Sequence, residues 1–374
     1  MNRRKYTLLQ ALYWCSAASL FCFAVSFMRA LGFSNAQVGL VAALGNLLGF
    51  SGSILLGAEI DGGRLRLFSA ATAALGLLIA AACSLVLHSG RDLFTGLILI
   101  ICFACSLSLN PLYIKIAGLI QKADSDLSFG LSRGVGSLAF ALTALAMGAL
   151  VQMLSTSIIP IAIVCTAVIQ LPVLLSLHRV CAHVDLGEKK EEGKASLLSF
   201  MRAMPRFCLL LLGIAVIFAA NNTVNNFLIN VVQNLRGNYA DLGRLSFFSA
   251  VIEFPAMLAY SRVSTKMRKR CLRLSLLFFP IKLLAISLAG SVPALFAAWH
   301  TPGRCSTWNI CRTFLLEKTL FYPFCLCYNR YKRLQSRQKN AKTGEVRRGK
   351  SHRNSKPEGR RWQNHQRRQP ERLC

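Results

Sequence analysis

Four ionisable side chains lie inside long apolar runs of this sequence, where a charge is costly: Lys115, Arg133, Glu253 and Lys282. In a membrane such residues are rare, and they mark paths for substrates, ions or protons. A buried carboxylate beside one cation can bind and release a proton near neutral pH, because burial and the cation act in opposite directions. We therefore expect Glu253 to serve in proton coupling or substrate binding, with Lys282 balancing its charge. The alternative is a static ion pair that fixes helix packing.

Polar and aromatic side chains in two other runs could contact a solute. Asn222, Asn225 and Asn226 fall at i, i+3 and i+4, so they share one face of a helix. That face either lines a water-filled cavity and binds substrate, or forms hydrogen bonds between helices. Tyr13 and Trp14 could stack on a ring-bearing substrate. The alternative for these two is the usual role of Tyr and Trp as anchors at the membrane interface.

The elements that position these residues are predicted to be membrane-spanning helices. Of the 374 residues, 54% are hydrophobic and only 16% are charged, whereas soluble domains carry about 25% charged residues. The apolar runs have the roughly 20-residue length that crosses a bilayer, and they lack the alternation of barrel strands. We identify nine, near 7–28, 36–58, 67–88, 93–118, 129–153, 156–178, 207–232, 243–260 and 272–290.

The basic residues predict the orientation of these spans. With the N-terminus in the cytoplasm, the inner segments hold 18 Lys and Arg residues and the outer segments hold four. Cytoplasmic loops carry the excess of basic residues, so we expect a cytoplasmic N-terminus in the cell's inner membrane. The polar connection at 179–206 then lies in the cytoplasm and separates six spans from the rest.

The two sides of that connection repeat each other. The segment Ser34-Asn35-Ala36-Gln37-Val38-Gly39 precedes one span, and Asn238-Tyr239-Ala240-Asp241-Leu242-Gly243 stands about 204 residues later. A short basic loop follows each of these spans. A repeat of whole helical halves is typical of transporters whose site lies near the midplane between the halves.

Three motifs resemble those of the major facilitator superfamily. They are Gly57-Ala58-Glu59-Ile60-Asp61-Gly62-Gly63-Arg64, Phe129-Gly130-Leu131-Ser132-Arg133-Gly134-Val135-Gly136-Ser137 and Glu253-Phe254-Pro255-Ala256-Met257. The second and third are most similar to the lactose-permease-like branch of oligosaccharide, nucleoside and phenylpropionate proton symporters. The first departs from the superfamily pattern by one position. The resemblance covers about residues 6–299.

The resemblance implies an all-α integral membrane fold of two helical bundles, with about nine of the family's twelve helices present. It implies proton-coupled symport of a sugar, nucleoside or aromatic acid by alternating access. In that branch the arginine of the second motif binds sugar, so Arg133 is expected to bind substrate; the alternative is an arginine that reaches the cytoplasmic rim. Asp61 and Arg64 fall in the loop that stabilises one state of the cycle, or they form a solvated turn. Gly130, Gly134 and Gly136 are expected to let another helix approach closely.

The last 75 residues differ from the rest. They hold 19 Lys and Arg against 4 Asp and Glu, out of a net charge of +29 for the chain, and they lack a hydrophobic period. Nine spans would place this basic tail outside, against the bias of the other loops. We expect a shifted reading frame or misassembled gene end after about residue 299, which would leave a C-terminally truncated transporter. Sequencing the gene in several isolates tests this. The alternative is a genuine tail that binds anionic lipid or nucleic acid.

Motifs of enzymes and metal sites are missing from the sequence. It has no glycine loop with lysine for phosphate, no HExxH and no G-x-S-x-G. We therefore expect no enzyme, no cofactor and no metal, and a monomer whose partners are the lipid bilayer, a small solute and protons. Alternatives are an inactive membrane remnant and a membrane anchor for the basic tail. The expected parts are a bundle at 1–178, a loop at 179–206, a partial bundle at 207–299 and a tail at 300–374.

Overall fold

The computed structural model describes residues 2–60, 64–123, 129–181, 202, 205–260 and 281–300. By compactness the chain divides into two units. One comprises Met1–Leu186 with Ile217–Thr313, and the other comprises Gly187–Val216 with Phe314–Cys374. The expected cytoplasmic loop at 179–206 and the basic tail at 300–374 fall almost wholly outside the described residues.

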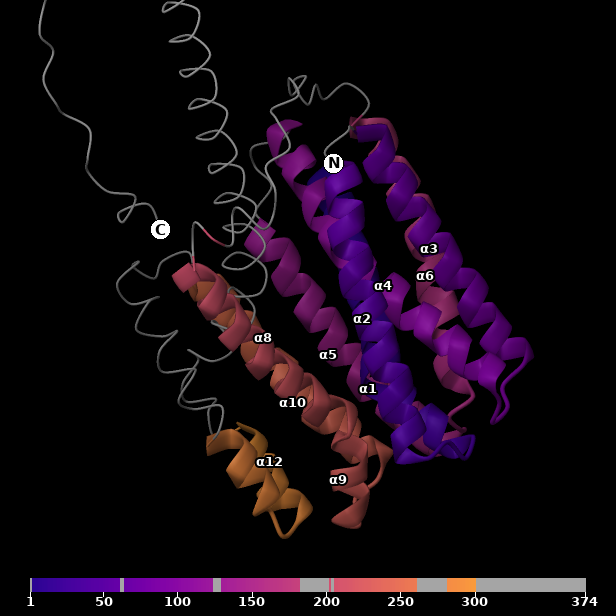
Figure 1. Cartoon of the computed structure of the whole chain (residues 1–374), viewed down its shortest axis with the longest axis vertical. Coiled ribbons are helices and arrows are strands. Elements are labelled where there is room, and N and C mark those ends of the chain that lie inside the picture. The colour runs from indigo at the N-terminus through magenta and orange to yellow at the C-terminus, as the bar shows by residue number, and fades with distance from the viewer. Residues whose placement is uncertain are drawn as a thin grey trace, which may run out of the picture. The chain divides into compact units, whose positions relative to one another are not determined.

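Helices account for nearly all of the described chain, and its residues include no strand (Figure 1). The predicted all-α fold is therefore confirmed. A further helical segment covers residues 281–287. The labelled helices are α1 (Asn2–Ala30), α2 (Asn35–Ile60), α3 (Arg64–Leu87), α4 (Leu93–Ala123), α5 (Phe129–Met153), α6 (Ile158–Val180), α8 (Pro205–Asn226), α9 (Leu228–Asn234), α10 (Tyr239–Tyr260) and α12 (Val292–His300).

The first six predicted spans correspond to α1–α6, because a bilayer-length apolar run forms a helix that satisfies its own backbone hydrogen bonds. The fifth span, predicted at 129–153, is reproduced at both ends by α5. Among the described residues, these six helices are long and apolar enough to cross a membrane. Their outward faces carry leucines, such as Leu47 and Leu142, which are 61% and 54% exposed and suit contact with lipid.

The seventh predicted span, 207–232, was wrong as a single helix. It is divided at Phe227 into α8 and α9. Asn221, Asn222, Asn225 and Asn226 lie just before the break, and asparagine is a weak helix former. After the break, the backbone N–H of Asn230 donates to the Phe227 carbonyl at 3.0 Å. This hydrogen bond spans three residues, as in a 3₁₀ turn, whereas that of an α-helix spans four.

The repeated segments begin α2 and α10 in the same way. Ser34 and Gln37 exchange hydrogen bonds, since each side chain accepts one from the other's backbone N–H, at 3.3 and 2.9 Å. Asn238 and Asp241 make the same exchange at 3.0 and 3.1 Å. Each pair is a capping box that satisfies two free N–H groups at the start of a helix. The sequence repeat is therefore a repeat of local structure.

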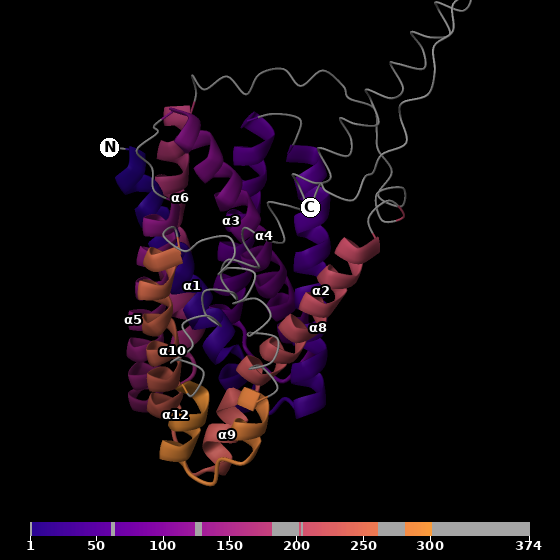
Figure 2. The ribbon, with the colours of Figure 1, turned by 90° about the vertical axis from the view of Figure 1, so that its left-hand side faces the viewer.

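Glycines bring the helices together at two places. On α2, a Cβ added to Gly45 or Gly49 would lie 2.6 Å from the Phe103 side chain or 2.7 Å from that of Leu107, both on α4. On α5 and α10, the approach is between backbones, since a Cβ on Gly148 would lie 2.8 Å from the Cα of Gly243. Figures 1 and 2 both show α5 and α10 side by side. This contact joins the first bundle to the later helices.

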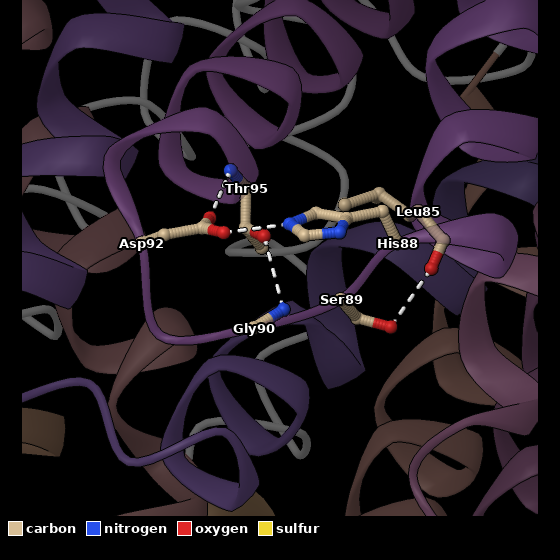
Figure 3. Close-up of polar contacts among 6 residues, drawn as sticks. All are labelled: Leu85, His88, Ser89, Gly90, Asp92 and Thr95. Carbon is tan, nitrogen blue, oxygen red and sulfur yellow. Dashed lines mark hydrogen bonds and ion pairs between the residues drawn. The ribbon is translucent and has the colours of Figure 1, made fainter.

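The turn between α3 and α4 is held by Asp92, the N-cap of α4 (Figure 3). Its Oδ1 accepts the Thr95 backbone N–H at 2.7 Å, and its Oδ2 lies 2.6 Å from Nε2 of His88. These hydrogen bonds lower the pKa of Asp92 to about 2, and the hydrogen bond with His88 has the largest effect. A carboxyl with a lowered pKa stabilises the fold above its ordinary pKa, and this contribution is lost as the pH falls toward 2.

Replacing His88 with alanine should therefore raise the pKa of Asp92 back toward its ordinary value of 3.8, because the largest cause of the shift is removed. A carboxyl ¹³C titration of labelled protein in detergent measures the change. Ser89→Ala is the matched control, since Ser89 bonds to the Leu85 carbonyl in the same turn and not to Asp92 (Figure 3). An Asp92 that still titrates near pH 2 in His88→Ala would show that the imidazole is not the cause.

Candidate functional site

A nearly buried arginine lies over a tryptophan ring where α5 packs against α1. Arg133 is in the second turn of α5 and is 8% exposed. Its Cζ atom lies 3.8 Å from the centre of the Trp14 ring. Its Nη1 donates a hydrogen bond of 2.8 Å to the Ser137 hydroxyl, one turn along the same helix. Stacking fixes the plane of the guanidinium and hence the direction of its in-plane N–H donors.

Burial bears on two of the alternatives left open by the sequence, while substrate binding by Arg133, Tyr13 and Trp14 stays a prediction. Arg133 does not extend into solvent at a rim, because its side chain is buried between α5 and α1. Tyr13 is 2% exposed, and its hydroxyl donates to the Ser106 carbonyl of α4 at 3.1 Å. Tyr13 is therefore part of the packed bundle and not an interface anchor. The Trp14 ring has edge contacts with Tyr13 and with Phe140 of α5.

Gly136 makes room for the Trp14 ring. A Cβ at this position would lie 2.5 Å from a carbon of the indole, so a larger residue would displace the ring from Arg133. The expectation of close approach is confirmed at Gly136. At Gly130 an added Cβ meets no atom of the described residues within 4 Å, so no close approach is seen there, and Gly134 stays a prediction.

A buried chain of hydrogen bonds continues from Trp14 into the bundle. Trp14 donates from Nε1 to Oε1 of Gln10 at 3.2 Å, and Gln10 donates from Nε2 to the Tyr6 hydroxyl at 2.6 Å. Tyr6 donates in turn to the Tyr113 carbonyl of α4 at 3.2 Å. The Tyr113 hydroxyl donates to Gln170 of α6 at 3.2 Å. Hydrogen bonds among α1, α4 and α6 thus support the position of Trp14 beside Arg133.

The asparagines of α8 face the first bundle through at least one contact. Asn222 donates from its amide to Oδ1 of Asn46 on α2 at 3.3 Å, which is the interhelical hydrogen bond considered for this face. Asn226 is buried and Asn225 is half-buried. Just beyond the break, Asn230 of α9 donates to Asn35 at the start of α2 at 3.1 Å. Contact with substrate at these positions stays a prediction.

Lys282 is 8% exposed, and its Nζ atom lies 4.0 Å from the centre of the Trp299 ring on α12. Glu253 lies in α10, and its side chain is outside the described residues. The expected Glu253–Lys282 pair therefore stays a prediction. Of the expected gating residues, Asp61 is outside the described residues, and Arg64 begins α3 with its side chain not described.

The sequence reading named Arg133 and Trp14 for separate reasons, and the structure brings them together. It missed Tyr6, Gln10, Tyr113 and Gln170. A signal for Gln10 was present, since Tyr6, Gln10 and Trp14 follow one another at intervals of four along one helical face of an apolar run. In the described part of the chain, no three His, Cys, Asp or Glu side chains gather in a way that could hold a metal ion.

Comparison with known proteins points to one family. Residues 7–317 match the Major Facilitator Superfamily, so the match continues past residue 299, where the resemblance was expected to end. A comparison with curated protein sequences finds no significant match.

Solved transporter structures share the fold. A crystal structure of a mutant of the nucleoside transporter NupG has a TM-score of 0.63 at 12% identity, over 83% of this chain and 81% of that one. Another NupG structure gives 0.60 at 12% identity, over 86% and 82%. A bacterial homolog of the human lysosomal transporter Spinster, inward-facing and unoccupied, gives 0.57 at 15% identity, over 83% and 72%. At such identities the likeness concerns the fold alone.

Proposed function

The chain belongs to the major facilitator superfamily of membrane transporters, and from this premise we propose that it is a secondary active symporter. Its cargo is a small polar solute, of the class of sugars, nucleosides or aromatic acids, and it moves together with protons. The two bundles carry the cargo by alternating access about a site to which Arg133 and Trp14 contribute.

The observation that carries this proposal is the buried Arg133–Trp14 pair. A guanidinium in a membrane helix is costly, so such residues almost always face the protein interior and have a functional role there. Arg133 faces that interior, and its plane is fixed by the Trp14 ring and the Ser137 hydroxyl. A guanidinium held in this way presents a planar set of donors that suits hydroxyl or carboxylate oxygens. Trp14 supplies the ring surface beside it.

The remaining roles follow from the sequence expectations. Glu253 takes up and releases the proton while Lys282 balances its charge, and Asn222, Asn225 and Asn226 line the path from α8. Asp61 and Arg64 stabilise one state of the cycle. The N-terminus lies in the cytoplasm, and the protein works as a monomer in the inner membrane.

Uptake into proteoliposomes tests the proposal. Purified protein is reconstituted with a pH difference of one unit, acidic on the side of cargo addition, and offered radiolabelled uridine, lactose or phenylpropionate. One pH unit stores about 1.4 kcal/mol per proton, enough for roughly tenfold accumulation. We expect one of the three to accumulate and a protonophore to abolish the accumulation. Uptake of none would contradict the cargo assignment.

Replacing Glu253 with glutamine separates coupling from transport. A neutral side chain cannot exchange the proton, so gradient-driven accumulation should fall from about tenfold to none. Exchange of internal for external cargo, which needs no net proton movement, should continue. Asp241→Asn, at the half-buried start of α10, is the control on the same helix. Unchanged accumulation in Glu253→Gln would remove Glu253 from the coupling step.

A further inference from the structure

Gln10 connects the Arg133–Trp14 pair to the rigid interior of the bundle. It is 1% exposed and sits one turn before Trp14 on α1. Both ends of its amide are used, one by Trp14 and the other by Tyr6. No motif described above includes this residue.

The direction of the three hydrogen bonds from Trp14 to the Tyr113 carbonyl follows from the chemistry of the groups. The Tyr113 carbonyl can only accept, so the Tyr6 hydroxyl gives its proton there. The indole N–H of Trp14 can only donate, so it must face the oxygen of the Gln10 amide. The amide nitrogen then points to the Tyr6 oxygen, which accepts. Gln10 is thus held in one orientation and, through it, so is the indole.

We propose that Gln10 is a positioning residue for cargo recognition, which holds the Trp14 ring in the plane that stacks on Arg133. This inference rests on the proposed function, because it concerns the cargo affinity of that site. Gln10 acts through Trp14 and does not itself contact the cargo. The ring also packs against Gly136 and has edge contacts with Tyr13 and Phe140, at centroid distances of 5.2 and 6.0 Å, but these contacts do not bond its N–H as Gln10 does.

Two substitutions distinguish positioning from simple core packing. Gln10→Met keeps the length and removes both hydrogen bonds. Gln10→Glu keeps the oxygen that accepts from Trp14, and it places a carboxyl in a buried position. If Gln10 only fills the core, methionine is the better replacement, because burying a carboxyl is the more costly change. If Gln10 positions Trp14, glutamate is the better replacement.

The experiment reads the Trp14 hydrogen bond directly. Phenylalanine replaces Trp299, Trp308 and Trp362, which leaves Trp14 alone among the four tryptophans, and ultraviolet resonance Raman spectra report the indole N–H bonding. In the chain with all its tryptophans, initial uptake rates of uridine, lactose and phenylpropionate give KM and kcat. Ser16→Ala is the matched control, because it removes a buried hydrogen bond on α1, from Gln170, at 3.3 Å.

We expect Gln10→Met to lose the bonded indole signal and to raise KM roughly five- to tenfold, the effect of about one hydrogen bond. Its kcat should change less than about twofold, and Gln10→Glu and Ser16→Ala should keep both the signal and KM. Tyr6→Phe, a milder change that removes the far anchor of Gln10, should raise KM about twofold and provides the test if Gln10→Met does not fold.

Two results would overturn the inference: a bonded indole signal that survives in Gln10→Met, or a KM in Gln10→Glu as high as in Gln10→Met. Failure of the proposed function looks different. In that case the unaltered protein takes up none of the three compounds, whereas the Raman signal still depends on Gln10.

Discussion

Replacing Arg133 with lysine is expected to lower kcat/KM for uptake by roughly 100-fold or more. Lysine keeps the charge but loses the plane that stacks on Trp14 at 3.8 Å and the fork that binds oxygens in pairs. Removing one partner of a buried, hydrogen-bonded charged contact costs about 2–5 kcal/mol, and each 1.4 kcal/mol is tenfold. Initial rates in proteoliposomes measure the loss.

A matched substitution shows whether the effect belongs to the site. Arg244 lies near the start of α10, is 58% exposed and pairs with Asp241 at 3.2 Å. An ion pair whose arginine is largely in solvent contributes little, so Arg244→Lys should transport at close to the unaltered rate. If Arg133→Lys transported as well as Arg244→Lys, the role of Arg133 would be limited to helix packing.

A leucine at Gly243 should stop transport while cargo binding persists. A Cβ added at this position would lie 2.7 Å from the Ala144 carbonyl oxygen of α5, so a larger side chain would separate the two helices. Overpacking costs roughly 1–3 kcal/mol, which disfavours this close contact by about 5- to 150-fold against an arrangement in which the helices have parted. A transporter that must form the contact once per cycle then loses most of its rate.

Uptake and equilibrium binding, measured side by side in the same reconstituted protein, test this expectation. Gly243→Ala should give an intermediate loss, because one methyl group demands a smaller shift. Gly130→Ala on α5 is the control, since an added Cβ there meets no described atom within 4 Å. Normal uptake in Gly243→Leu would mean that the α5–α10 contact does not change during the cycle.

The lengths and places of the first six helices could be predicted because hydrocarbon permits few alternatives. An apolar run of bilayer length must satisfy its own backbone, and α5 accordingly ends where the run ends, at Met153. The break at Phe227 was missed, because that run stays apolar on both sides of the asparagines. Hydropathy measures solvent preference and is insensitive to a change in local backbone geometry.

The candidate site was only half predictable for a different reason. Arg133 belongs to a motif and is a charged residue in an apolar run. Its candidacy as a site residue can therefore be inferred from the sequence of one helix. Its partner Trp14 lies 119 positions earlier in the chain, and Asn222 meets Asn46 across 176 positions. Which residues meet depends on how one helix is rotated and shifted along another. Glycines such as Gly136 help to determine that rotation and shift. The rotation and shift themselves cannot be read from a single sequence.

The reciprocal caps at Ser34–Gln37 and Asn238–Asp241 have a consequence for the energetics of rocking. Each cap lies within four consecutive residues. If α2 and α10 tilt as rigid helices, their capping hydrogen bonds therefore stay intact. Tilting would instead change contacts between helices. Among these are the hydrogen bonds of Asn35 with Asn230 and of Gln152 with Tyr239, at 3.1 and 3.2 Å. Both hydrogen bonds are exposed, so water can replace a lost partner, and breaking them during the cycle should cost little free energy.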